Sequence, residues 1–125
     1  MPPLLIFAVI LFTIALVFYT WGVWAEYRIK RLQSVHAKLF FAGVCVDSSA
    51  TVLTYIAVGG LTLTAHSIMG FISLFLMIIH FVWALWVLRG NDEQKLTRFH
   101  RLSLFVWSVW MLSYVSGFVL GMAKL

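Results

Sequence analysis

Hydrophobic residues fill four long stretches of the chain, and polar residues gather between them. The apolar runs cover about residues 4–25, 39–58, 68–88 and 102–122. Each run approaches the roughly 20 residues that a helix needs to cross the hydrocarbon core of a bilayer. Because the connections between the runs are short, successive helices should be antiparallel neighbours. The pattern predicts an all-α protein, an integral membrane up-down four-helix bundle.

The polar connections give the expected helix boundaries. We expect helices over about residues 4–27, 35–58, 66–89 and 94–122, forming a single transmembrane domain over residues 1–125. Gly90 stands where the third helix should end, and Asn91 and Asp92 stand where the fourth should be capped. The first run is not preceded by basic residues and is longer than the apolar core of a signal peptide. It is therefore predicted to be retained as a helix.

Composition and charge predict how the helices are oriented across the membrane. The chain is 63% hydrophobic and 10% charged, which is typical of a membrane protein. The first and third connections hold nearly all the cations, namely Arg28, Lys30, Arg31, Lys38, Arg89, Lys95, Arg98 and Arg101, and only Lys124 lies on the other side. The positive-inside rule then places both basic connections in the cytoplasm and both termini outside. The net charge of +5 is attributed to this topology and to contact with anionic lipid or ligand, not to nucleic acid.

Five ionisable side chains lie within or at the edges of the predicted spans, where polar groups are expensive and often mark function. They are His36, His66, His80, His100 and Asp47. His66 and His80 are 14 residues apart, which turns them by only about 40° and separates them by roughly 21 Å along a helix. These two histidines therefore share one face of the third helix.

The second, third and fourth helices each carry a comparable stripe of residues on one face. On the third helix it includes Gly70, Ser73 and Met77. On the second it comprises His36, Phe40, Gly43, Asp47, Thr51 and either Thr54 or Tyr55. On the fourth it comprises His100, Ser103, Trp107, Trp110, Tyr114 and Gly117. Three helices thus offer inward surfaces that combine imidazole, glycine and aromatic groups.

This combination suits a b-type heme. Two imidazoles from facing helices can ligate the iron, small residues let a porphyrin lie against the backbone, and cations at the aqueous edge can pair with the propionates. Lys38, Arg98 and Arg101, with Arg31, are placed for that last role. Helix packing in membranes also favours small residues, so the argument depends on the histidines.

The sequence leaves the pairing of the histidines open. A tight hairpin at Gly90 would bring His80 and His100 to similar depth. A loose connection over residues 92–98 would instead leave His100 level with His36, and the diagonal pair would become the better candidate. His36 and His100 could also be interfacial residues that bond to lipid or to helix ends.

The roles of His66 and Asp47 also stay open between alternatives. His66 has no histidine partner at its depth, so an outer heme would need Met122, a second subunit or a single ligand. Asp47 and His80 lie about equally far from the cytoplasmic ends of their helices. We therefore predict that Asp47 accepts the free ring N–H of His80 and fixes its tautomer. The alternative is a protonated Asp47 that bonds to a nearby hydroxyl or carbonyl on its own helix.

Four stretches carry a resemblance that covers nearly the whole chain. They are "ALVFYTWGVWAE", "SVHAKLFFAGVCVDSSAT", "HSIMGFISLFLMIIHFVWALWVL" and "FHRLSLFVWSVW". The chain resembles the small bacterial heme-sequestering membrane protein family in the placement of its histidines and tryptophans. The resemblance implies a four-helix protein of the bacterial cytoplasmic (inner) membrane that binds heme and gives tolerance to excess heme. It implies His36, His66, His80 and His100 as the candidate ligand set.

The predicted function is therefore sequestration of heme b through histidine ligation, with no enzymatic activity. The sequence shows no nucleophile–base pattern, phosphate-binding loop or zinc-ligand spacing that would favour hydrolase or kinase chemistry. One alternative is a b-type cytochrome that exchanges electrons with quinone, although no second helix carries a matching histidine pair. Another is a small proton-coupled exporter in which Asp47 carries the proton. A homodimer would shield the edges of a porphyrin that one small bundle leaves open.

Overall fold

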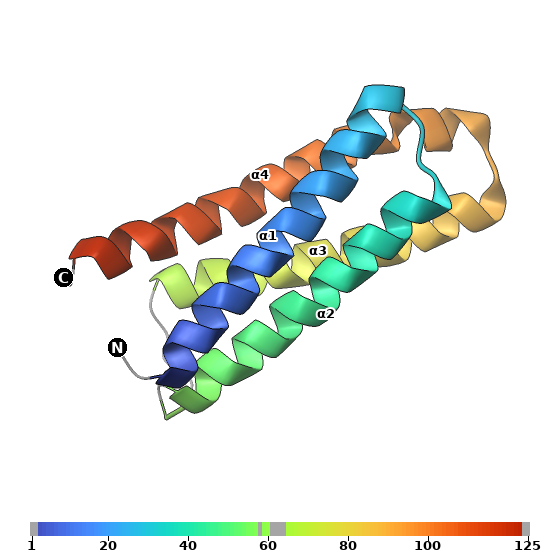
Figure 1. Cartoon of the computed structure of the whole chain (residues 1–125). Coiled ribbons are helices and arrows are strands. Elements are labelled where there is room, and N and C mark those ends of the chain that lie inside the picture. The colour runs from blue at the N-terminus through green and yellow to red at the C-terminus, as the bar shows by residue number, and fades with distance from the viewer. Residues whose placement is uncertain (1–2, 58, 61–64, 124–125) are drawn as a thin grey trace.

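Four long helices make up the computed structural model, which describes residues 3–57, 59–60 and 65–123 (Figure 1). They are α1 (Pro3–Ile29), α2 (Ser34–Ala57), α3 (Ala65–Gly90) and α4 (Glu93–Ala123). Each helix is long and apolar enough to span a membrane, which confirms the all-α class and the multi-pass character expected from the hydrophobic runs. Most of the connection between α2 and α3 lies outside the described residues, as does Lys124.

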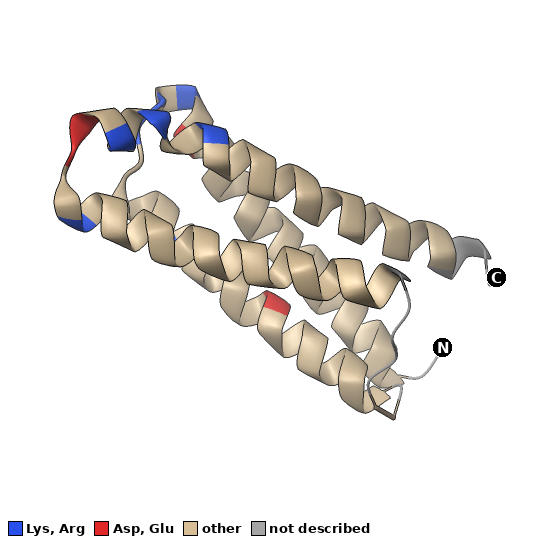
Figure 2. Cartoon of the chain, turned by 180° about the vertical axis from the view of Figure 1, so that it is seen from behind, with Lys and Arg blue, Asp and Glu red and all other residues tan. Residues whose placement is uncertain are grey.

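The helices lie side by side. Each one contacts the helix next to it in sequence, and α1 also contacts α4. Figure 1 shows the α1–α2 and α3–α4 connections at one end of the molecule, while α2 ends and α3 begins at the other. In Figure 2 the lysine and arginine positions gather at the end that holds the two connections. The basic residues thus mark one end of the molecule.

The closest packing joins α1 to α2 through two reciprocal glycine–aromatic contacts. A Cβ on Gly22 of α1 would lie 2.8 Å from Cε1 of Phe40 on α2. A Cβ on Gly43 of α2 would overlap the ring of Tyr19 on α1. Each glycine therefore leaves room for an aromatic ring of the opposite helix, a use of small residues that is common between membrane helices. These contacts fix where Tyr19 and Phe40 lie.

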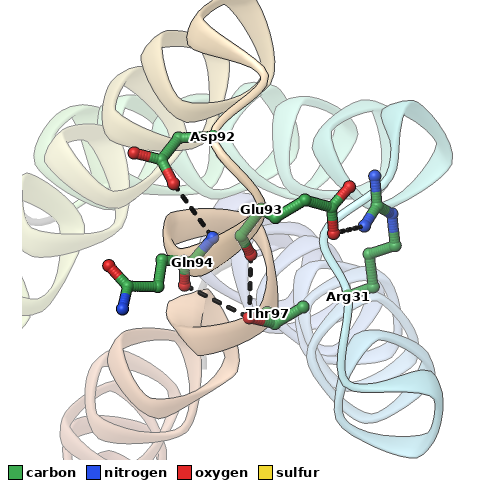
Figure 3. Close-up of polar contacts among 5 residues, drawn as sticks. All are labelled: Arg31, Asp92, Glu93, Gln94 and Thr97. Carbon is green, nitrogen blue, oxygen red and sulfur yellow. Dashed lines mark hydrogen bonds and ion pairs between the residues drawn. The ribbon is translucent and has the colours of Figure 1, made fainter.

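The basic end is held together by polar contacts around the start of α4 (Figure 3). Asp92 caps α4, because its Oδ1 accepts a hydrogen bond of 2.9 Å from the backbone N–H of Gln94. Arg31, in the α1–α2 connection, forms an ion pair with Glu93, and this hydrogen bond raises the pKa of the Arg31 guanidinium. Both connections are thereby tied to each other.

The α3–α4 connection is tight, since only Asn91 and Asp92 separate the two helices. Asn91, which was expected to help cap α4, instead ends α3 with a left-handed backbone (φ 52°). Asparagine tolerates this conformation better than most residues because its short side chain can bond locally. Residues 93–98 are helical, so the loose-connection alternative for this segment is wrong.

The core contains two hydrophobic clusters, and residues of each contact a buried polar side chain. The cluster nearer the basic end consists of Val23, Leu32, Phe40, Ala84, Val87, Leu96 and Phe99. The second consists of Ala15, Tyr19, Met77, Val106 and Trp110. Phe40 and Phe99 of the first contact His80, whereas Tyr19 and Trp110 of the second bind Asp47. The inner surfaces therefore hold two separate polar sites.

Candidate functional site

Three helices meet in a buried hydrogen-bonded chain of Glu26, Ser103 and His80. The Ser103 hydroxyl donates to Oε1 of Glu26 at 2.6 Å. Its oxygen, Oγ of Ser103, also lies 2.8 Å from Nε2 of His80. Glu26 on α1 and Ser103 on α4 are fully buried, and His80 on α3 is 1% exposed. We call this group the Glu26 network. Charged and polar side chains at such depth are costly unless they are paired, which makes the network a candidate site.

Aromatic rings enclose the imidazole of His80. The ring of Phe40 lies 4.5 Å away between centroids, and the ring of Phe99 is stacked on the imidazole at 5.0 Å. Phe99 also lines a surface hollow between α3 and α4 whose rim carries Lys95 and Arg98. A single aromatic side chain thus contacts both the buried histidine and the basic hollow.

Three buried side-chain atoms among the described residues make no hydrogen bond: Oε2 of Glu26, Nδ1 of His80 and Nδ1 of His100. Two of them belong to the Glu26 network. His100 lies one helical turn before Ser103, and its ring packs 5.8 Å from that of Tyr27, the neighbour of Glu26. Buried polar atoms without partners are uncommon and call for an explanation. Their concentration here marks this part of the structure as the place where a ligand could bind.

Asp47 belongs to a different network. Its Oδ2 accepts hydrogen bonds from the hydroxyl of Tyr19 at 3.0 Å and from Nε1 of Trp110 at 2.9 Å. The predicted hydrogen bond from His80 to Asp47 is therefore wrong, because Nε2 of His80 is beside Ser103 and its Nδ1 has no partner. The physical reason is the rotation of α1, which brings Glu26 and Tyr19 inward to complete both networks.

The other two histidines have partners of their own. Nδ1 of His36 accepts a hydrogen bond of 3.0 Å from the backbone N–H of Gln33, as a side chain in the first turn of a helix can do. His66 lies against α4, where its Nδ1 is 3.0 Å from the hydroxyl of Ser116. His80 and His100 thus each keep a buried ring nitrogen without a hydrogen-bond partner, whereas one ring nitrogen of His36 and one of His66 are bonded within the protein. The side chain of Met122, the other candidate partner for His66, lies outside the described residues.

The cations predicted to pair with propionates lie on the surface. Lys38, Arg98 and Arg101 are all exposed. Arg98 faces the hollow that Phe99 lines, whereas Arg31 is already paired with Glu93. Arg98 and Lys95 therefore line the same hollow as Phe99, whose ring contacts His80.

Among the described residues, the buried side-chain atoms without a partner are two imidazole nitrogens and one carboxylate oxygen. In the described part of the chain, no group of three or more His, Cys, Asp or Glu side chains is arranged to hold a metal ion. Heme iron takes four ligands from its porphyrin and asks the protein for one or two axial donors. The two unpartnered imidazole nitrogens are donors of that kind, and Phe40 and Phe99 cover the faces of the His80 ring.

Sequence reasoning missed Glu26. The apolar run ends at about residue 25 and the predicted helix at about residue 27, so Glu26 stands at the helix end and is not among the five ionisable residues assigned to the spans. A signal was present, because Ala8, Ala15 and Gly22 repeat every seven residues and Glu26 follows one turn later on the same face. Extending that stripe would have placed Glu26 inside the structure.

Comparisons of the chain with protein-family models, with curated proteins and with solved structures found no match. The class that the fold defines is a helical membrane protein with four candidate spans and two buried polar networks. The resemblance to heme-sequestering proteins stays a prediction.

Proposed function

We propose that this protein binds heme b inside the bacterial cytoplasmic membrane and sequesters it, which gives tolerance to excess heme. The observation that carries the proposal is the buried Nδ1 of His80, which has no hydrogen-bond partner, together with that of His100. A neutral imidazole nitrogen is a common axial ligand of heme iron, and two such ligands fill both axial positions. Filling both positions suppresses reaction of the iron with oxygen or peroxide.

The basic hollow beside Phe99 supports the proposal. Lys95 and Arg98 place positive charge where the two carboxylates of a heme would reach the aqueous edge. Movement of the Phe99 ring would connect this hollow with His80, since that ring contacts both. In this proposal Arg98 and Lys95 bind the propionates, Arg101 and Lys38 add positive charge, and a homodimer shields the exposed porphyrin edge.

We propose that the helices form an up-down bundle with the basic end in the cytoplasm and both termini outside, following the positive-inside rule. A C-terminal alkaline phosphatase fusion should then be active in intact cells, and a C-terminal fluorescent-protein fusion should be dark. Fusions placed in the α3–α4 connection should behave in the opposite way. A fluorescent C-terminal fusion would contradict the orientation.

The direct test is an optical spectrum of detergent-purified protein from heme-replete cells, recorded before and after reduction by dithionite. We expect the low-spin spectrum of a b-type heme with two nitrogen ligands. A pyridine hemochrome assay gives heme per chain, which distinguishes one storage site from two hemes that could conduct electrons. A colourless protein that takes up no added heme would contradict the proposal.

Proton-coupled export is the second candidate, and the observation that favours it is the presence of two buried carboxylates, Glu26 and Asp47, in separate networks. Ionisable groups within membrane spans are frequent in proton relays. A colourless protein that nevertheless drives substrate efflux with a proton gradient, and loses this efflux in Asp47→Asn, would select this function instead.

A further inference from the structure

Ser103 donates its hydroxyl hydrogen to another helix, unlike the other helical serines whose bonds are described. Ser49, Ser73 and Ser108 each donate a hydrogen bond to a carbonyl of their own helix. Such local bonds are the ordinary choice for a serine inside a helix. Ser103 instead donates across the interface to Glu26, and its oxygen also meets His80. Its hydroxyl therefore joins side chains from two other helices.

The direction of these bonds fixes the proton on His80. A serine hydroxyl has one hydrogen, and when Glu26 is ionised its carboxylate oxygens can only accept, so Ser103 gives that hydrogen to Oε1 of Glu26. Towards His80, at 2.8 Å, the same oxygen can only accept. Nε2 must then carry the hydrogen, and in a neutral imidazole the other nitrogen, Nδ1, keeps the lone pair. That Nδ1 is the atom that is buried without a partner.

Burial stabilises this tautomer of His80 against the other one. Water cannot replace either partner, because Glu26 and Ser103 are fully buried and the imidazole is enclosed by Phe40 and Phe99. An unmet donor on His80 would be costly in such surroundings. Reversal of the tautomer would also need reversal of the Ser103 hydroxyl, which would leave Glu26 without its bond.

We infer that Glu26 and Ser103 are positioning residues that hold His80 in the Nε2–H tautomer and so present the lone pair of Nδ1 to a ligand. Neither residue was assigned a role from the sequence stripes alone, and neither needs to touch the ligand. His80 takes this tautomer in the protein without heme. The consequence for heme affinity rests on the proposed function, because partners that orient a metal-ligating histidine also tune its affinity.

The test is the ¹⁵N NMR spectrum of histidine-labelled, heme-free protein in detergent, in which the two neutral tautomers give distinct patterns of ring-nitrogen signals. Loss of signals in His80→Gln identifies His80. We expect a single Nε2–H form in the unmodified chain. Ser103→Ala removes the acceptor, and Glu26→Leu frees the serine hydroxyl to donate to Nε2, so each variant should populate the Nδ1–H form. Ser73→Ala, a buried serine that bonds only to its own helix, is the matched control and should leave the His80 signals unchanged.

Heme titration of the same variants separates this inference from the proposed function. We expect affinity to fall by about 10–100-fold in Ser103→Ala and Glu26→Leu, and to stay unchanged in Ser73→Ala. A tautomer that responds as expected in a protein that binds no heme would uphold the positioning role and reject the heme function. A mixed or Nδ1–H His80 in the unmodified protein would overturn the inference, as would a tautomer insensitive to both variants. If Glu26→Leu fails to fold, the Ser103→Ala spectrum decides alone.

Discussion

If the protein binds heme as proposed, replacement of His80 by leucine is expected to remove most of the heme from the purified protein. The loss of affinity should reach about 100-fold or more, since removal of a ligand should cost at least as much as removal of a residue that orients one. Leucine still fills much of the space between Phe40 and Phe99, so the helical fold should persist. The measurement is heme per chain after purification, followed by titration of the heme-free protein with heme.

The same substitution at the other histidines tells which nitrogens bind iron. His100→Leu should also lower heme content, because its buried Nδ1 has no partner. His36→Leu and His66→Leu should have much smaller effects, because a nitrogen of each ring is already bonded within the protein. If His80→Leu retained its heme while His36→Leu lost it, the assignment of His80 would be wrong.

The spans were predictable because their signal is additive along the chain. Every apolar residue in a run of about 20 contributes to membrane insertion, so the four helices follow from hydrophobicity alone. The tight α3–α4 connection was partly readable as well, since Gly90, Asn91 and Asp92 are residues that end and begin helices. What these residues could not decide was which of them adopts the left-handed backbone.

The partners of the buried carboxylates were not predictable, because they depend on the rotation of each helix about its axis. Equal depth suggested that Asp47 meets His80, but depth alone does not say which neighbour lies nearest. In the structure α1 supplies the missing groups, with Tyr19 bound to Asp47 and Glu26 bound through Ser103 towards His80. The first helix contains no histidine and was left out of the predicted site for that reason.

The two networks also explain why polar residues sit so deep in a small membrane protein. Each polar atom that is bonded within a network ties together helices that lipid would otherwise separate, because hydrogen bonds across helices help to hold them together in a bilayer. Asp47 joins α2 to α1 and α4, whereas Ser103 joins α4 to α1 and α3. The Asp47 network satisfies its donors in this way. In the Glu26 network, Oε2 of Glu26 and Nδ1 of His80 have no hydrogen-bond partner, and these are the atoms that the proposed ligand could use.

Gly43→Ala is expected to destabilise the protein by about 2–4 kcal/mol, the sum of overpacking and of a weakened buried hydrogen bond. The new Cβ would overlap the ring of Tyr19, which is fully buried and is held in place by its bond to Asp47. The ring cannot move away without breaking that bond. The measurement is unfolding in a dodecyl sulfate titration followed by circular dichroism. Gly70→Ala is the matched control, since its Cβ would meet only Ser113 at an ordinary 3.8 Å and should change stability by no more than about 1 kcal/mol.

A double-mutant cycle assigns the cost of Gly43→Ala to its cause. In a Tyr19→Ala background the ring that the new Cβ meets is gone, so Gly43→Ala should then cost little, and the two substitutions should be far from additive. In a Tyr19→Phe background the ring remains and only the bond to Asp47 is lost, so most of the overpacking should persist. Equal costs in all three backgrounds would show that the α1–α2 contact does not depend on Tyr19. The position of Tyr19 next to Asp47 would then need another explanation, because the glycine is what allows that ring to reach the carboxylate.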